Sequence, residues 1–389
     1  MRSGRSQTLA WKIPLFDTDF GAEEEEALIA VIRRGWVSAG PETQEFEREF
    51  SEFLGGPEVV FLSSGTASIH LALASVGIGP GDEVIAPAFT YIATCSPVLW
   101  LGARLRLADS ASLKNPNISP ETVEGLVNER TKAIIFLHYA GFSEGIAEMA
   151  RFCEERGIAL IEDAAHTHGS VSGGRKPGTF GKVGCFSFFA NKNMTSGEGG
   201  ALVTFDKQLA ERARRMASHG RTAAAWDRFR DSALKTYDIT EMGYNYKATD
   251  MQAALARVQL RKLPEANRKR VELVRLYREL LSDIPGLVIP FDDYESSANY
   301  IFPIVLPEEV GRLSVMESLA DAGIQTSVHY PAVHTFTYYR KLFPELRLPV
   351  AEELASRELS LPLYPHMGED KVRFVAEKLS EILRTQGRN

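Results

Sequence analysis

From residue 58 onward the sequence alternates between short runs rich in β-branched residues and longer stretches whose apolar residues have helical spacing. The run EVVFLSS precedes the helical stretch TASIHLALASVG, and GIAEMARFCEERG precedes the run IALIEDAA. This alternation is typical of an α/β protein with a mostly parallel sheet and helices on its faces. Five more runs belong to the same predicted sheet, which are DEVIAPA, ARLRLAD, KAIIFLH, VGCFSFF and GALVTF.

Helical spacing also marks residues 22–34 and 42–54 before the sheet and residues 250–284 after it. The last of these stretches contains Pro264, so we expect a kink or a break there. A chain of 389 residues exceeds the size at which one hydrophobic core keeps growing. We therefore predict a large domain with an N-terminal arm over residues 1–260 and a smaller C-terminal domain of helices and strands over residues 261–389.

Composition and charge argue against several classes of protein. Hydrophobic residues make up 44% of the chain, and the formal net charge of −7 opposes general attraction to nucleic acid. No apolar stretch has the length of a membrane span or a signal peptide, so we expect neither membrane insertion nor secretion. The three cysteines lie far apart without a disulfide or zinc pattern, which favours a reducing cytoplasm.

Ligands of parallel sheets bind at the carboxyl ends of the strands, and the segment SSGTAS at 63–68 is the first such place. Here a predicted strand passes through Gly65 and Thr66 into a helix. A helix N-terminus beside a glycine suits an anion such as phosphate, although a simple helix cap with a turn glycine explains the same residues. A nucleoside triphosphate loop is not supported, because GTFGKV lacks the earlier glycine and the following serine or threonine.

The second place is the end of the run IALIED, where Asp163 follows Glu162 and two histidines come soon after. A carboxylate at this edge either holds a cationic ring nitrogen or caps a loop. A metal site of Asp163, His166 and His168 is the less favoured alternative, because two histidines one residue apart come with no further ligand motif. We therefore predict no metal.

The third place is the segment VGCFSFFANKNMTSGEGGALVTF, in which a hydrophobic strand delivers Ser187 and then Lys192 to a loop of small and polar residues. A lysine beside apolar strands loses solvation, which lowers its pKa and makes the amine nucleophilic. Lone lysines are usually solvated surface charges. Lys192 is therefore a catalytic candidate only in combination with the other two places.

In this order the segments resemble the DegT/StrS-type (DegT/DnrJ/EryC1/StrS) sugar aminotransferases, which are pyridoxal 5'-phosphate (PLP) enzymes of fold type I. The resemblance covers nearly the whole chain. It implies a seven-stranded central sheet, a PLP site in the large domain and a homodimer with shared active sites. The segments that carry it are GWVSAGPETQEFEREF, SSGTASIHLAL, DEVIAPAFTYIATCSPV, EDAAHTHGS, GTFGKVGCFSFFANKNMTSGEGGALVT, GYNYKATDMQAAL, HYPAVH and ELSLPLYPHM.

The resemblance also assigns roles to single residues. Lys192 corresponds to the Schiff-base lysine that shuttles protons, and Asp163 to the carboxylate that keeps the pyridine nitrogen protonated. Phe89 matches the aromatic residue that stacks on the cofactor ring, and His166 matches the position near its phenolic oxygen. The residues that correspond to the phosphate site are Gly65, Thr66 and Ser187, with Asn245 donated across the dimer interface.

On the substrate side, the resemblance implies that His329, Trp36 and Ser38 line the cleft. The chain departs from the common family pattern at residues 189–191, which are Phe-Ala-Asn where many relatives have His-Pro, and in having Phe as the stacking residue. Some relatives carry histidine in place of the lysine and are sugar 3-dehydratases. Lys192 argues against that chemistry here.

We therefore expect transfer of an amino group from L-glutamate or glutamine to a keto group of a nucleotide-linked deoxysugar, for a lipopolysaccharide, another surface glycan or a natural product. The segment SHGRTAAAWDRF at 218–229, followed by YNYKATDMQAALARVQL, resembles family members that act at carbon 4 of the sugar. Two alternatives stay open, which are amination of a free cyclic ketone such as an inosose or of an aminobenzoate precursor, and a regulatory protein without turnover. Nucleotide binding needs basic side chains at the cleft mouth, and the candidates are Arg221, Arg228, Lys247 and Arg340.

Overall fold

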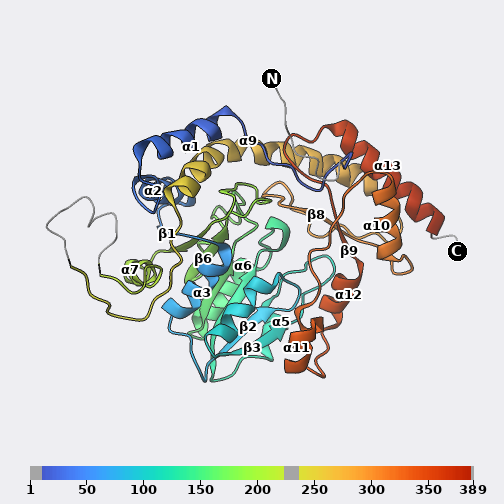
Figure 1. The fold of residues 1–389 in the computed structure, drawn as a ribbon. Helices are drawn as coiled ribbons and strands as arrows, with labels where there is room; N and C mark the ends of the chain where they lie inside the picture. Colours follow the sequence, from blue (N-terminus) through green and yellow to red (C-terminus); the bar gives the residue numbers. More distant parts are fainter. Residues whose placement is uncertain (1–10, 223–235, 387–389) are drawn as a thin grey trace.

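The computed structural model describes residues 11–222 and 236–386, and a seven-stranded sheet lies at its centre (Figure 1). The strands are β1 (Glu58–Leu62), β2 (Glu83–Pro87), β3 (Arg104–Ala108), β4 (Thr131–Leu137), β5 (Ala159–Asp163), β6 (Val183–Ser187) and β7 (Gly200–Thr204). Their order is β1-β7-β6-β5-β4-β2-β3, with β7 antiparallel to both of its neighbours and all other neighbours parallel. The predicted mostly parallel, seven-stranded sheet is confirmed.

Both faces of this sheet are buried, and successive residues of a strand point to opposite faces. In β4, Ile135 packs in the same core cluster as α3 (Gly65–Ser75), whereas Ile134 and Phe136 pack in the cluster that contains α6 (Ile146–Glu155). A strand covered on both faces needs a continuous apolar run rather than an alternating one. The clusters also include α4 (Ser96–Trp100) and α7 (Lys207–Met216) on the α3 side and α5 (Pro120–Glu124) on the α6 side.

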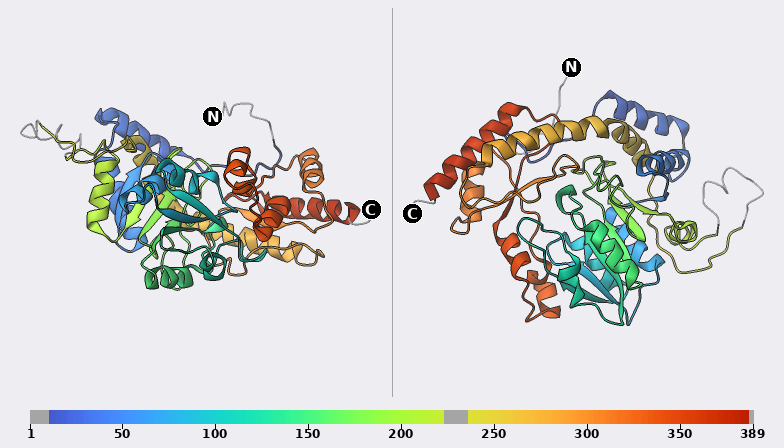
Figure 2. Two further views of the ribbon diagram at one scale, coloured as in Figure 1. Left: turned by 90° about the horizontal axis from the view of Figure 1, so that it is seen from below. Right: turned by 180° about the vertical axis from the view of Figure 1, so that it is seen from behind.

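The helices α1 (Ala22–Arg34) and α2 (Pro41–Leu54) precede the sheet and pack against the long helix α9 (Asp250–Leu281), which arches across the molecule (Figures 1 and 2). Of the predicted kink or break near Pro264, the break is wrong, because α9 continues through this residue. A proline inside a helix removes the hydrogen bond to the carbonyl four residues earlier, here that of Leu260. Packing of α9 against α1, α2 and α13 (Glu369–Gln386) offsets this loss.

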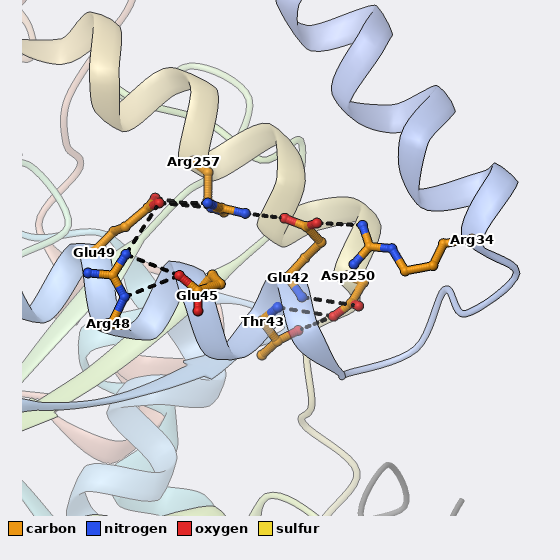
Figure 3. A network of polar contacts seen from close by, with 8 residues as sticks. All are labelled: Arg34, Glu42, Thr43, Glu45, Arg48, Glu49, Asp250 and Arg257. Carbon is orange, nitrogen blue, oxygen red and sulfur yellow. Dashed lines mark hydrogen bonds and ion pairs between the residues drawn. The ribbon is translucent and has the colours of Figure 1, made fainter. Parts of the chain in front are cut away.

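Asp250, the first residue of α9, holds the N-terminus of α2 (Figure 3). The N-cap of α2 is a glycine, so this helix has no side-chain cap of its own. Instead, Asp250 Oδ1 accepts hydrogen bonds from Thr43 N at 3.0 Å and Thr43 Oγ1 at 2.8 Å. Further along α9, Arg257 pairs with Glu42 at 2.5 Å and with Glu49 at 2.7 Å. These contacts lock α2 onto the start of α9.

The C-terminal part of the chain builds a second core. The strands β8 (Phe302–Val305) and β9 (Glu358–Leu361) pair antiparallel and pack with α10 (Arg312–Asp321), α13 and the second half of α9. Ile13 of the N-terminal arm joins this core and forms a β-bridge to Ile324. The helices α11 (Thr337–Leu342) and α12 (Pro349–Arg357) reach the core of the large sheet through Tyr339 and Leu354.

We propose that the boundary between the two domains lies inside α9, somewhat after the predicted position between residues 260 and 261, because Leu263 still packs in the same core as Leu260. Leu260 packs with residues of β1, β6 and β7, whereas Leu273 packs with β8, β9 and α13. One helix therefore contributes to both cores and fixes their relative position. Within residues 11–222 and 236–386, every helix is too short or too polar to cross a membrane.

Candidate active site

A cavity of about 400 Å³ opens at the carboxyl ends of β5 and β6, beside the N-terminus of α3. All three places predicted from the sequence contribute to its wall, although the first, at Gly65, lies 98 residues before the second, at Asp163. His329, from the segment that follows α10, also lies on the wall. The predicted residues that line the cavity are Gly65, Thr66, Asp163, His166, Ser187, Lys192 and His329.

The N-terminus of α3 forms one end of the cavity. Ser64 caps this helix, since its Oγ accepts a hydrogen bond from Ala67 N at 3.1 Å. Gly65 lies so close to β6 that a Cβ atom added to it would stand 2.7 Å from Ser187 Cβ. Only glycine therefore fits between the helix and the strand. The free N–H groups and the positive end of the helix dipole make this end of the cavity a suitable site for phosphate.

Asp163 is the last residue of β5 and is 4% exposed. Its Oδ2 accepts a hydrogen bond from Thr94 Oγ1 at 2.7 Å, and its Oδ1 accepts one from Ala165 N at 3.3 Å. Burial raises the pKa of this carboxyl, whereas the two hydrogen bonds and the positive charge of Lys192 act in the opposite direction. A cationic ring nitrogen in the cavity favours the ionised form further, because opposite charges stabilise each other.

Lys192 lies in the connection between the antiparallel neighbours β6 and β7, with its Nζ 4.1 Å from the centroid of the Tyr300 ring. Its backbone N donates to Phe189 O at 2.9 Å, which fixes the start of this loop. Removal from water lowers the pKa of Lys192 to about 7, although the nearby Asp163 carboxylate opposes the shift. Much of the amine is therefore neutral and nucleophilic near neutral pH.

His166 stacks on Tyr300, with ring centroids 4.2 Å apart, and its Nε2 hydrogen-bonds Tyr330 Oη at 3.1 Å. Burial lowers the pKa of His166 well below its usual value, so the ring is neutral. Its Nδ1 is buried and has no hydrogen-bond partner within the described part of the chain. Because buried polar atoms are rarely left without a partner, this nitrogen indicates a place for a polar atom of a ligand.

Phe89 does not belong to the cavity wall. Its side chain is 1% exposed, and its ring packs on Tyr139 with centroids 5.2 Å apart. Tyr91, two residues later, lines the cavity and is 58% exposed. The assignment of the stacking role to Phe89 is therefore wrong on geometric grounds, because a core side chain cannot reach a ring in the cavity. Tyr91 takes its place as the candidate.

Trp36 and Ser38 lie in the connection between α1 and α2, outside the cavity of this chain. Trp36 Nε1 donates to Ala39 O at 3.1 Å, and Ser38 O accepts from Asp250 N at 3.3 Å. The prediction that they line the cleft is not met within one copy of the chain. Contact with a substrate would require the cleft of another copy.

Asn245 also lies outside the cavity and is exposed. Its Oδ1 accepts a hydrogen bond from Lys247 Nζ at 2.5 Å, and its backbone forms a bridge to Ser218. An exposed position away from the chain's own cavity is compatible with a role in another copy.

The basic residues suggested for nucleotide binding are not on the cavity wall. Arg228 and residues 223–229 of the segment 218–229 lie outside the described residues. Arg221 covers the Tyr237 ring at 4.9 Å, and Arg340 Nη2 donates to Thr335 O at 2.8 Å. Within the described chain, Lys192 is the only lysine or arginine that lines the cavity.

Sequence reasoning missed Thr94, Tyr300 and Tyr330, which support Asp163, Lys192 and His166. Thr94 lies in the segment DEVIAPAFTYIATCSPV, in which the resemblance assigned a role only to Phe89. Tyr330 follows His329 in the quoted segment HYPAVH, so a signal was present there. No local motif marks Tyr300, whose position depends on how the C-terminal part of the chain packs on the large domain.

The profile of the DegT/DnrJ/EryC1/StrS aminotransferase family matches residues 18–380. The chain belongs to this family. It is 36% identical over 387 residues to the spore coat polysaccharide biosynthesis protein SpsC of Bacillus subtilis (strain 168), with 98% of each chain covered.

Solved structures agree with this assignment. The aminotransferase TlmJ from Streptoalloteichus hindustanus is 32% identical, with a TM-score of 0.89 over 96% of this chain and 99% of that chain. DesI, solved in the presence of its TDP-sugar product, is 30% identical, with a TM-score of 0.83 over 94% of this chain and 91% of that chain. The chain is a sugar aminotransferase of fold type I.

This aminotransferase depends on PLP, and solved relatives include PLP and PMP forms. The cavity has the features that such a cofactor needs, which are a nucleophilic amine, a buried carboxylate, an anion-binding helix end and an unpartnered ring nitrogen of His166. When bound, PLP supplies an electron sink for the charge that develops as a proton leaves the amino donor.

Proposed function

We propose that this sugar aminotransferase moves an amino group from L-glutamate or L-glutamine to the keto group at carbon 4 of a nucleotide-linked deoxysugar. The observation that carries the nucleotide-linked class is the close similarity of nearly the whole chain to DesI, whose structure was solved with a TDP-sugar product. The similarity to SpsC, a spore coat polysaccharide biosynthesis protein, supports a role in making a surface glycan.

In this proposal Lys192 binds the cofactor and then carries the proton between the carbon atoms that exchange the amino group. Its lowered pKa suits this task, because an amine with a pKa of about 7 both accepts and releases a proton near neutral pH. Asp163 holds the proton on the ring nitrogen, and Thr94 keeps the carboxylate oriented through its hydrogen bond. His166 would offer its Nδ1, which has no partner in the described chain, to a polar atom of the cofactor, and Tyr91 would pack against the cofactor ring.

Gly65, Thr66 and Ser187 hold the cofactor phosphate at the end of α3, and Asn245 of a second copy completes this site. A homodimer is therefore part of the proposal, with Trp36 and Ser38 reaching the partner's substrate. The surface around α1 supports an interface, because Ile29, Ile32 and Val37 are large apolar residues with 44%, 58% and 47% of their surface exposed. These residues flank the connection that carries Trp36 and Ser38.

Amination of a free cyclic ketone such as an inosose is the second candidate. One observation favours it, because the described part of the cavity wall offers no basic side chain besides Lys192 to a nucleotide diphosphate. A homodimer would supply such groups from its second copy, whereas a free cyclic ketone needs none.

The visible absorption spectrum tests both candidates in one experiment. The purified holoenzyme is treated with L-glutamate or L-glutamine, and then with TDP- or UDP-linked 4-keto and 3-keto sugars or with an inosose. The PLP absorption should fall with the amino donor and return only with a nucleotide-linked 4-keto sugar. Return with the inosose alone would overturn the proposal. A protein that stays colourless with added PLP would support the regulatory alternative.

A further inference from the structure

His329 stands on the cavity wall and is held from behind by two buried polar side chains. Its backbone N donates to Glu358 Oε2 at 2.7 Å, and its Nδ1 forms a hydrogen bond with Ser360 Oγ at 2.9 Å. Ser360 Oγ in turn donates to Glu358 Oε1 at 2.6 Å. His329 is 8% exposed, Glu358 1% and Ser360 0%. The three groups therefore exchange hydrogen bonds with one another, and the buried Tyr139 hydroxyl is a further partner of this cluster, donating to His329 O at 2.6 Å.

The protons in this set can be counted. Burial lowers the pKa of His329 to about 4, so the ring is neutral and carries one N–H and one lone pair. An ionised Glu358 only accepts, so the single hydroxyl proton of Ser360 points to Glu358 Oε1. Ser360 Oγ can then only accept from His329, which places the ring proton on Nδ1. His329 Nε2 is left with its lone pair, and it forms no hydrogen bond with a described residue.

A neutral group at position 358 permits the opposite arrangement. A protonated carboxyl, or the amide of a glutamine, donates to Ser360 Oγ. The serine proton is then free to turn toward His329 Nδ1, which becomes the acceptor. The ring proton moves to Nε2, on the nitrogen that has no protein partner.

We infer that Glu358, acting through Ser360, determines which ring nitrogen of His329 carries the proton, and with it whether Nε2 accepts a hydrogen bond from a substrate hydroxyl. The identity of that donor as a hydroxyl of a ketosugar rests on the proposed function. The proton arrangement itself is a property of the protein alone. Glu358 and Ser360 are positioning residues, because they act on the cavity only through His329.

The Glu358 pKa of about 8 means that the charge of this residue changes near pH 8. Burial raises the pKa of Glu358 to about 8, while Ser360, the His329 N–H, Arg312 of α10 and the Tyr139 hydroxyl act against this shift. Tyr139 and Tyr330 face the same cluster, and their pKa values lie well above the usual value, so both stay neutral. Above about pH 8 the carboxylate therefore favours the Nδ1–H form of His329, which has a lone pair on Nε2. Below about pH 8 the population of the Nε2–H form increases.

Nitrogen NMR of the holoenzyme, labelled with ¹⁵N-histidine, measures the position of the ring proton directly. The His329 signals are identified by their loss in His329→Gln. The pH is varied from about 6.5 to about 9.5, which extends more than one pKa unit to either side of the Glu358 pKa of about 8. Over this range His329 should change from mixed forms to the Nδ1–H form, with a midpoint near pH 8. In Glu358→Gln this change should disappear. Ser360→Ala should also remove it, without altering the charge at 358.

Glu352→Gln is the matched control, because Glu352 Oε1 hydrogen-bonds another histidine, His334 Nε2, at 3.0 Å. This variant should affect the signals of His334 and leave those of His329 unchanged. At pH 9, Glu358→Gln should raise KM for the ketosugar on the order of tenfold, the effect of about one hydrogen bond, and leave KM for the amino donor unchanged.

The inference is overturned if His329 keeps the same proton position in the wild type and in Glu358→Gln throughout this pH range. If Glu358→Gln does not fold, Ser360→Ala tests the same inference, because a His329 proton position that still changes with pH in this variant would overturn it. A failure of every ketosugar to react would instead contradict the proposed function, and the NMR result would still decide the role of Glu358.

Discussion

Thr94 Oγ1 donates a hydrogen bond of 2.7 Å to Asp163 Oδ2, and both side chains are buried. Thr90 Oγ1 lies 2.7 Å from Thr94 Oγ1, so a chain of hydroxyl groups leads to the carboxylate. This contact joins the segment after β2 to the end of β5. It also opposes the effect of burial on the Asp163 pKa.

Thr94→Val should weaken cofactor retention at acidic pH. Burial already raises the Asp163 pKa, and loss of the Thr94 hydrogen bond raises it further. The carboxylate that holds the ring nitrogen is then lost at a higher pH as the solution is acidified. We expect the acid limb of PLP retention to move up by roughly one pH unit, equivalent to one hydrogen bond to a charged group. Thr90→Val is the control, since it leaves the Thr94–Asp163 contact in place, and equal shifts in both variants would contradict this account.

Lys192→Ala should abolish both turnover and the adduct that borohydride traps between protein and PLP. In the wild-type protein, the rate of PLP incorporation should rise with pH through about 7 and then level off, because the neutral amine is the reacting form and the Lys192 pKa is about 7. Lys182→Ala is a suitable control, because Lys182 is paired with Asp206 at 2.8 Å on the surface. A trapped adduct that persists in Lys192→Ala would assign the role to another lysine.

Tyr91→Leu and Phe89→Leu should have different effects. Tyr91 lines the cavity, so its loss should increase the dissociation constant of PLP several-fold with little change in folding stability. Phe89 is buried in the core, and its replacement should lower the free energy of unfolding by about 1–2 kcal/mol. Urea unfolding and a PLP titration separate the two effects. If only Phe89→Leu weakened PLP binding, the stacking role would return to Phe89.

Asp250→Ala should lower the free energy of unfolding by about 2 kcal/mol, because it removes the buried acceptor at the N-terminus of α2. Glu45→Ala, on the exposed side of the same network, removes an ion pair with Arg48 and should change stability by less than about 0.5 kcal/mol (Figure 3). Both values come from urea unfolding at one protein concentration. Similar losses in the two variants would contradict the anchoring role of Asp250.

Asn245→Ala should weaken PLP binding without changing the absorption spectrum of the bound cofactor, since the proposal places this side chain at the phosphate of a second copy. Lys247→Ala removes the hydrogen-bond partner of Asn245 Oδ1 and tests whether that contact orients the amide. Equilibrium dialysis of PLP and sedimentation of the protein measure affinity and assembly separately. Unchanged affinity in Asn245→Ala would exclude the shared phosphate site.

The sequence alone predicted all seven strands of the sheet, because the buried strands need continuous apolar runs that stand out between helices. It also predicted that Asp163, Ser187 and Lys192 share one cavity, since Asp163 and Ser187 end two neighbouring strands and Lys192 lies between β6 and β7. Once the sheet order is known, the carboxyl ends of neighbouring parallel strands lie at the same edge of the sheet, so the residues there lie close together. The roles given to them by family resemblance remain proposals that the variants above test.

Other features depend on contacts that no local pattern encodes. The choice between Phe89 and Tyr91 follows from how the chain turns after β2, where a shift of two residues separates the core from the cavity. The continuity of α9 at Pro264 depends on helices that pack against it from both ends of the chain. In the sequence, nothing distinguishes Glu358 from an ordinary charged residue at the start of a strand. Only the fold places it behind His329.

The position of β7 constrains the order in which this chain can fold during synthesis. Among the strands of the described sheet, β1 pairs only with β7, with Leu62 opposite Gly200. A ribosome makes β1 early, yet that strand stays at an open edge until residue 200 has left the exit tunnel. The turn that follows β1, which is proposed to hold the cofactor phosphate, therefore forms late, after a long-range closure of the slow, non-local kind. A nascent chain stopped before this point would expose an unpaired strand to chaperones rather than hold a cofactor.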